Sequence, residues 1–240
     1  MKILAIGNSF SQDATRYIEG IAGGELYVRN IYIGGCSLKT HAAHVADGVA
    51  AYMYEKDAEA IEPISIQDAL TREKWDMVTV QQVSAESGLV ETYEPYIETV
   101  LELVRTLAPQ AKIHFHKTWA YENSSTHPAF HYYRSDRHYM KARIDSATKE
   151  IAEKYGLPVI PVGDAIAAAR ANAEFDPERG GVNITRDGFH LSFDYGRYLA
   201  GLVWYKYFTG KSAAEVEFVP EVCDNAALVE IVKKAADAVL

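Results

Sequence analysis

The 240-residue sequence predicts an α/β protein: a three-layer α/β/α sandwich around a five-stranded parallel sheet, formed as a single domain over residues 1–240. Five short apolar segments suited to strands alternate with segments of helical periodicity, which is typical of β-α-β units. Right-handed crossovers between such units place helices on both faces of a parallel sheet. No composition break, repeat or low-complexity linker divides the chain, and its length is sufficient to bury a substantial core.

The predicted strands are short apolar runs that glycine, proline or polar residues interrupt. They cover Lys2–Ile6, Leu26–Ile33, Trp75–Val80, Lys112–Thr118 and Leu157–Val162. The second of these alternates in polarity and stops at a double glycine, Gly34-Gly35. A double glycine permits positive φ and close backbone approach; the alternative is that it serves only as a turn.

The predicted helices carry apolar residues at three- and four-residue spacing. They cover Asp13–Ala22, Leu38–Tyr54, Glu94–Leu107, Tyr139–Tyr155, a segment from Asp164 through Asn172, Tyr195–Phe208 and Asn225–Val239. Residues 55–72 are polar and mixed, with a short helical patch at Ile66–Leu70. Residues 122–137 and 173–194 are expected to be irregular, because neither shows a sustained period.

Composition and charge exclude several classes of protein. The net charge of −9, without a cluster of lysine or arginine, argues against a nucleic-acid or anionic-membrane partner. Cys36 and Cys223 are far apart and have no metal or redox spacing, so no disulfide framework is expected. The sequence shows no secretory signal and no apolar run of about 18 residues, so we expect a cytoplasmic location and no membrane span.

The histidines give little indication of a metal site. His41 and His44 lie three apart in a predicted helix, but no carboxylate pattern accompanies them. His114 and His116 share one face of a predicted strand, where we expect them to pack or to bond locally. We therefore expect no metal and no cofactor.

The opening residues combine a strand, a tight turn and the start of a helix. The strand Lys2–Ile6 ends at Gly7-Asn8, Ser9 follows, and helical spacing begins at Asp13. In such a turn backbone N–H groups converge and the helix dipole favours negative charge. This position suits a nucleophile whose attack creates an oxyanion. The alternative is that Ser9 or Ser11 only caps the helix.

Other small or polar residues follow the predicted strands. Gly35, Gln81, Gln82 and Trp119 all lie at carboxyl ends of strands, as Ser9 does. In open α/β sheets the site lies at this edge. The convergence favours an enzyme over a simple helix cap.

His190 is the best candidate for a general base. It lies after all five strands in Asp187-Gly188-Phe189-His190, where the carboxylate of Asp187 can reach the Nδ1 side of the imidazole. That contact would fix the tautomer and stabilise the imidazolium. Asp-x-x-His alone is a weak signal, and its value comes from its combination with Ser9 as nucleophile.

These motifs together resemble the SGNH (GDSL-like) hydrolases. Gly7-Asn8-Ser9-Phe10-Ser11 is similar to their nucleophile block, and Gly34-Gly35-Cys36-Ser37 to the second block, whose glycine N–H serves the oxyanion hole. Asp187-Gly188-Phe189-His190 is similar to the final block with the acid and the base. The similarity is greatest to a bacterial branch with the blocks IGNSFS, GGCSL, QQ-x-S and DGFHLS, and it implies a flavodoxin-like SGNH hydrolase fold.

One block departs from the family pattern. Its third block has a Gly-x-Asn-Asp-like turn with an asparagine amide in the oxyanion hole, whereas this chain has Gln81-Gln82-Val83-Ser84. A glutamine amide can donate the same N–H from one methylene further away. Strand alternation directs only one of Gln81 and Gln82 toward Ser9, and the sequence leaves open which one.

The resemblance implies a serine esterase acting on small carboxylic esters. Ser9 would attack, His190 would act as base, and N–H groups of Ser9 and Gly35 with a glutamine amide would hold the oxyanion. The expected partner is a small-molecule ester, with O-acetyl groups on a carbohydrate as the first choice. Trp119 and Tyr121 would then stack on sugar faces; the alternative is that they only close the core.

Other functions compete with this interpretation. One is a non-catalytic carbohydrate- or ligand-binding module on the same fold, which would have no need of the complete Ser9, Asp187 and His190 set. Another is a nucleotide-binding flavodoxin-like protein, but the first turn matches neither GxGxxG nor a P-loop. Thioesterases and lipases of the same superfamily use similar machinery.

Overall fold

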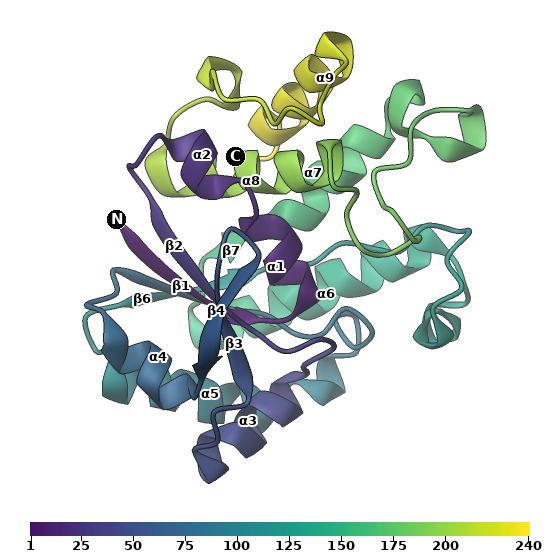
Figure 1. Ribbon diagram of the computed structural model, residues 1–240. Coiled ribbons are helices and arrows are strands. Elements are labelled where there is room, and N and C mark those ends of the chain that lie inside the picture. Colours follow the sequence, from purple (N-terminus) through teal and green to yellow (C-terminus); the bar gives the residue numbers. More distant parts are fainter.

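A twisted sheet of seven strands forms the centre of the computed structural model, which describes residues 1–240 (Figure 1). The strands are β1 (Lys2–Gly7), β2 (Tyr27–Tyr32), β3 (Tyr52–Lys56), β4 (Glu59–Ile64), β5 (Met77–Val80), β6 (Lys112–His116) and β7 (Val159–Ile160). Their order is β4-β3-β2-β1-β5-β6-β7, and β1, β2, β5, β6 and β7 run parallel. The five predicted parallel strands are therefore confirmed, with β1 inside the sheet.

The sheet also contains an antiparallel hairpin that the sequence did not predict. β3 pairs antiparallel with β2, and β4 pairs antiparallel with β3. The predicted helix Leu38–Tyr54 was wrong in its second part, because the helix ends at Asp47 and Gly48 caps it in the left-handed conformation. The sheet thus has seven strands rather than five.

The helices cover both faces of the sheet (Figure 1). They are α1 (Ser9–Thr15), α2 (Ile18–Ala22), α3 (Leu38–Asp47), α4 (Ile66–Arg72), α5 (Tyr96–Leu107), α6 (Arg137–Tyr155), α7 (Val162–Arg170), α8 (Tyr195–Thr209) and α9 (Ala226–Asp237). Short 3₁₀ helices are η1 (Val90–Thr92), η2 (Pro128–Tyr133), η3 (Ala173–Phe175), η4 (Pro177–Arg179) and η5 (Ala213–Glu215). The predicted helix Asp13–Ala22 is divided between α1 and α2. No helix has the length and apolar character needed to cross a membrane.

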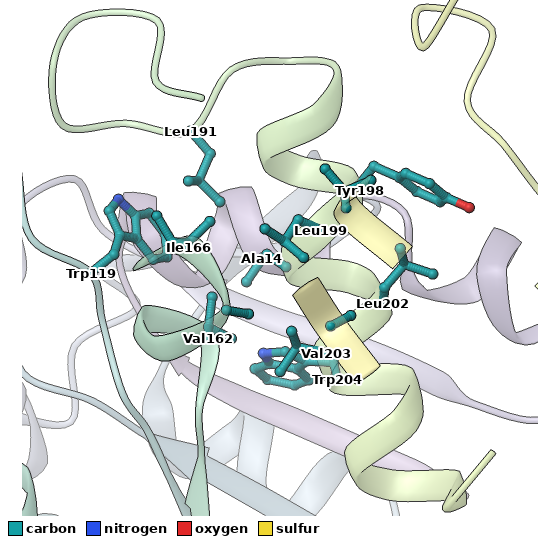
Figure 2. Close-up of a cluster of buried hydrophobic side chains, with 14 of the residues drawn as sticks. Ala14, Trp119, Val162, Ile166, Leu191, Tyr198, Leu199, Leu202, Val203 and Trp204 are labelled. Atoms are coloured by element: carbon teal, nitrogen blue, oxygen red, sulfur yellow. The ribbon is translucent and has the colours of Figure 1, made fainter. Parts of the chain in front are cut away.

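The core consists of two apolar clusters, one on each face of the sheet. Alternation along β1 sends Ile3 and Ala5 to one cluster and Leu4 and Ile6 to the other. The first cluster includes residues of α1, α2, α7, α8 and α9, and Figure 2 shows its α8 side chains lying beside those of α7. The second includes residues of α3, α4 and α5, while α6 contributes to both. This confirms the three-layer sandwich, in which the carboxyl ends of the parallel strands share one edge.

Candidate active site

Ser9 is the first residue of α1, directly after the turn that ends β1. Asn8 is the N-cap: its Oδ1 accepts the Phe10 N–H at 3.0 Å. Ser11 completes a capping box, because its Oγ accepts the Asn8 N–H at 3.1 Å. The interpretation of Ser9 as a helix cap is therefore wrong, and its hydroxyl is left for another partner.

That partner is His190, 181 positions later in the chain. The Oγ of Ser9 lies 2.9 Å from Nε2 of His190, and Nδ1 of His190 lies 2.7 Å from Oδ2 of Asp187. The three predicted residues thus form one continuous chain of hydrogen bonds. Ser9 and His190 are half-buried, whereas Asp187 is exposed.

The protonation pattern of this chain follows from its chemistry. A carboxylate only accepts, so Nδ1 of His190 carries the proton and Nε2 is left to accept from Ser9. Burial raises the pKa of Asp187, but hydrogen bonds from the ring and backbone N–H of His190 and from the Phe189 N–H outweigh it. The net pKa of Asp187 is therefore below its ordinary value. An ionised Asp187 both fixes the tautomer and stabilises an imidazolium.

The turn that carries the acid and the base is closed by backbone contacts. Thr185 and Leu191 form an antiparallel bridge across it. Gly188, at its tip, has a φ of +86° and lies so close to Ser125 that a Cβ would be 2.9 Å from the Cα of Ser125. Its carbonyl accepts the Glu122 N–H at 2.8 Å. Only glycine fits this backbone conformation and this approach without strain.

The two backbone N–H groups predicted for the oxyanion hole have no partner within the protein. The N–H groups of Ser9 and Gly35 donate to no acceptor within the protein. Gly35 is exposed and has a φ of +66°, and its loop is held to the end of β1 because Asn8 Nδ2 donates to the carbonyl of Cys36 at 2.9 Å. The helix dipole of α1 adds to the positive potential beside Ser9.

The two predicted glutamine donors point to other partners. Gln81 is 1% exposed, and its amide donates to Asn8 Oδ1 at 2.8 Å. Gln82 is fully buried; its Oε1 accepts the Leu38 N–H and its amide donates to the carbonyl of Thr92 at 3.2 Å. A substrate at the surface does not reach either amide in this arrangement. The prediction of a glutamine in the oxyanion hole is therefore not supported.

Gln81 instead belongs to a buried relay of neutral groups. His116 Nδ1 donates to Gln81 Oε1 at 2.7 Å, Gln81 donates to Asn8, and Asn8 donates to Cys36. Burial lowers the pKa of His116 to about 3, so its ring is neutral. The relay connects the ends of β6, β5 and β1 to the Gly35 loop. The sequence did indicate local bonding for His116, but not this connection.

Trp119 and Tyr121 lie in the core rather than on the surface. Trp119 is 1% exposed and stacks on Phe10 with ring centroids 4.1 Å apart, within the cluster of Figure 2. Tyr121 is fully buried, and its hydroxyl lies 2.8 Å from Ser84 Oγ. The expectation that these rings stack on sugar faces is wrong, and the alternative that they close the core is correct. Trp119 still serves the site, because its Nε1 donates to the carbonyl of Phe189 at 2.7 Å.

Two residues near Ser9 were missed as parts of the site. Asn8 holds both the start of α1 and the Gly35 loop, and Asp13 binds the turn that carries His190. The signal for Asn8 is its residue type directly before a helix, where asparagine is a preferred N-cap. The signal for Asp13 is its spacing of one helical turn from Ser9.

No group of three or more histidine, cysteine or acidic side chains is arranged to hold a metal ion. His41 Nδ1 lies 2.8 Å from the hydroxyl of Tyr52 and 3.6 Å from the sulfur of Cys36. Burial lowers the pKa of His41 to about 3. The pair His41 and His44 therefore serves the packing of α3 against β3.

Solved structures share this fold with the chain. A candidate SGNH hydrolase from Slackia heliotrinireducens is 22% identical with a TM-score of 0.58, covering 87% of this chain and 98% of that one. A lipase/acylhydrolase from Enterococcus faecalis is 16% identical with a TM-score of 0.53, covering 87% and 95%. The fold is thus that of the SGNH hydrolases, as the sequence motifs predicted.

The chain belongs to the DUF4886 family, a domain of unknown function, whose family model matches residues 2–239. A DUF4886 family protein from Bacteroides uniformis ATCC 8492 is 34% identical with a TM-score of 0.90. The match covers 99% of this chain and 93% of that one. No curated protein matches the sequence.

Proposed function

We propose that this protein is a serine esterase that hydrolyses small carboxylic esters. The observation that carries the proposal is the chain of hydrogen bonds from Ser9 through His190 to Asp187, at 2.9 and 2.7 Å. These distances support the assignment of Ser9 as nucleophile, His190 as base and Asp187 as orienting acid. The fold shared with SGNH hydrolases supports the same class of reaction.

The proposed mechanism uses Ser9, His190 and two backbone N–H groups. His190 Nε2 takes the proton of Ser9 as Oγ attacks the ester carbonyl carbon, and the N–H groups of Ser9 and Gly35 stabilise the oxyanion. His190 then protonates the leaving alcohol as the C–O bond breaks. Water, deprotonated by His190, attacks the acyl-enzyme, and collapse of the second oxyanion releases the acid and restores Ser9. One oxyanion donor is worth about 10²–10³ in rate.

The alcohol that we propose first is a carbohydrate bearing O-acetyl groups. The buried positions of Trp119 and Tyr121 remove the stacking argument for a sugar. Substrate experiments therefore decide the alcohol part of the ester. A different alcohol would leave the proposal of a serine esterase unchanged. Lipase and thioesterase activity would use the same Ser9, so acyl chain length is the property to vary.

The test compares wild type with Ser9→Ala on p-nitrophenyl esters of increasing acyl length, and then on acetylated sugars. Loss of the nucleophile is expected to lower kcat by about 10⁴–10⁶-fold. Ser65→Ala is the matched control, since Ser65 only caps α4. Ser65→Ala should keep the wild-type activity.

Labelling with an organophosphonate makes the test independent of the natural ester. Mass spectrometry should find one phosphonyl group on Ser9 in wild type and none in Ser9→Ala. Wild-type esterase activity in Ser9→Ala would overturn the proposal, as would a failure of the phosphonate to label Ser9. Preference for long acyl chains would keep the serine esterase but replace the acetyl ester as substrate.

A further inference from the structure

Asp13 is a fully buried carboxylate that the proposed mechanism does not use. It lies on α1, four residues after Ser9, and its side chain has 0% exposure. A buried carboxylate needs hydrogen-bond donors or opposite charge to offset its desolvation. Its partners therefore show what the charge is there to hold.

Two of these partners flank the turn that carries Asp187 and His190. Arg186, directly before Asp187, donates from Nη1 to both carboxylate oxygens of Asp13 at 3.0 Å. Leu191, directly after His190, donates its backbone N–H to Asp13 Oδ2 at 2.9 Å. The Asp13 carboxylate thus holds both ends of the turn, Arg186 and Leu191, which we call its stems.

The stems are also bonded to each other. The N–H of Arg186 donates to the carbonyl of His190 at 2.9 Å, and Nη1 of Arg186 donates to the carbonyl of Leu191. Asp13 therefore binds a closed unit, and a shift of its carboxylate would move the unit as a whole.

A third partner ties the cluster to α8. Arg197 donates from Nε to Asp13 Oδ1 at 2.8 Å, and its Nη2 lies 2.8 Å from the same oxygen in an ion pair. The ring of Phe193 lies against both guanidinium groups, 4.8 Å from Cζ of Arg186 and 4.6 Å from Cζ of Arg197. Two cations thus converge on one anion from two segments, which fixes its position more tightly than a single pair would.

We propose that Asp13 is a positioning residue that sets the distance between Ser9 Oγ and His190 Nε2. The inference rests on the proposed serine esterase function. Ser9 and Asp13 lie about one turn apart on the same helix, about 6 Å along its axis, so the helix acts as a rigid spacer between them. Holding nucleophile and base within hydrogen-bond distance is worth a large factor in rate, and a misplacement of about 1 Å can cost about 10²-fold.

The test measures the rate at which an organophosphonate labels Ser9 in wild type and in Asp13→Asn. Asparagine has nearly the same shape but removes the charge and places an N–H₂ donor against Arg186, Arg197 or the Leu191 N–H. We expect labelling and kcat to fall by about 10- to 100-fold. KM should change less than about twofold, because Asp13 is buried and does not contact substrate.

Asp237→Asn is the matched control, since Asp237 pairs with Lys206 and accepts the Ala213 N–H at 2.8 Å, away from Ser9. It should lower Tm but keep the labelling rate. A merely structural role for Asp13 would give the same result in both variants, with Tm lowered and the labelling of the folded protein unchanged.

Arg186→Gln provides a second variant if Asp13→Asn does not fold. It removes one cation but leaves Arg197 and the Leu191 N–H on Asp13, so we expect a smaller fall of about 5- to 10-fold. Wild-type labelling rates in folded Asp13→Asn, or in Arg186→Gln when Asp13→Asn is unfolded, would overturn the positioning role. A wild type that the phosphonate does not label would instead overturn the serine esterase itself.

Discussion

The two sides of the candidate site are held in place by different chemistry. On the nucleophile side, which comprises the Asn8-Ser9 turn and the Gly35 loop, the support is the neutral relay from His116 through Gln81. On the base side, which comprises residues 185–192, the support is the ion cluster of Asp13. Both supports fix a reacting group, but one does so without charge and the other with three charges.

The difference follows from where each support lies. The relay runs along the carboxyl ends of β6, β5 and β1, and its side chains from His116, Gln81 and Asn8 are buried. An ion there would lose its hydration completely and would need full compensation. Neutral amides and a neutral imidazole are joined there by directional hydrogen bonds, and Nε2 of His116 has no hydrogen-bond partner. The ion cluster lies between α1, α8 and a surface turn, and the side chains of Arg186 and Arg197 keep 25% and 12% exposure. Because the two cations stay partly hydrated, the desolvation cost of the ion cluster is lower at the rim of the sheet.

The largest expected effect comes from removing the buried Trp119 ring, which supports the base side. Trp119→Ala deletes the ring that stacks on Phe10 and the N–H that holds the carbonyl of Phe189. Truncating a buried tryptophan is expected to lower the free energy of unfolding by about 3–5 kcal/mol. The loss of the bond to Phe189 should also slow phosphonate labelling of Ser9. Chemical denaturation and labelling rates measure the two effects.

Trp75→Ala separates these two effects. Trp75 is as fully buried as Trp119 and also donates to a backbone carbonyl, that of Ala69, but it belongs to the cluster on the opposite face of the sheet. It should lose similar stability and keep the wild-type labelling rate. Equal labelling rates in the two variants would show that Trp119 supports only the core.

A smaller loss is expected from breaking the relay on the nucleophile side. Gln81→Leu leaves His116 Nδ1–H without an acceptor in a fully buried position and removes one donor to Asn8. An orphaned buried polar group costs about 1–3 kcal/mol, so denaturation should show a loss of about 2 kcal/mol. Labelling of Ser9 should slow as Asn8 loses its support.

The control for the relay is Gln67→Leu. The Gln67 amide donates to the carbonyl of Val45 and joins α4 to α3, so its loss should leave labelling unchanged. If Gln81→Leu and Gln67→Leu label Ser9 equally fast, the relay has no part in holding the nucleophile.

The sequence predicted the parallel strands because apolar runs and their glycine, proline and polar boundaries are local signals. It missed the hairpin of β3 and β4 for two physical reasons. Tyr52 continues the helical register of α3, so only Gly48 marks the end of that helix. The hairpin turn is made by Asp57 and Ala58, which both have positive φ although neither is glycine. A turn of this kind normally shows itself as Asn-Gly or Asp-Gly.

The candidate site divides in the same way. Ser9, Asp187 and His190 were predictable because each lies in a short motif and the order of the motifs matches a known family. The supports were not, because Asp13 meets Arg197 across 184 positions and Gln81 meets His116 across 35. No local pattern specifies such pairs. The same limit explains the misplaced roles of Gln81 and Gln82, since a strand end shows which residues are polar but not which partners they meet.

The sharpest distinction between the two supports concerns acid. The pKa of His116 is lowered to about 3 by burial, so the folded protein leaves this ring neutral while the unfolded chain protonates it below pH about 6.5. Stability must therefore fall as pH is lowered from about 6.5 toward 3, by about 1.4 kcal/mol per pH unit for this one group. His41 and His114, with pKa values lowered to about 3 and about 4, act in the same direction.

His116→Asn measures how much His116 contributes to the pH dependence of the free energy of unfolding. Asparagine places an N–H₂ donor near the position of Nδ1, so the bond to Gln81 can persist, but the side chain no longer titrates. The free energy of unfolding, measured in urea between pH 6 and pH 4, should fall less steeply than in wild type by about 1.4 kcal/mol per pH unit. His131→Asn, at an exposed histidine, is the control. Parallel slopes in wild type and His116→Asn would mean that His116 takes up a proton inside the folded protein, and that the relay on the nucleophile side tolerates a charge as the base side does.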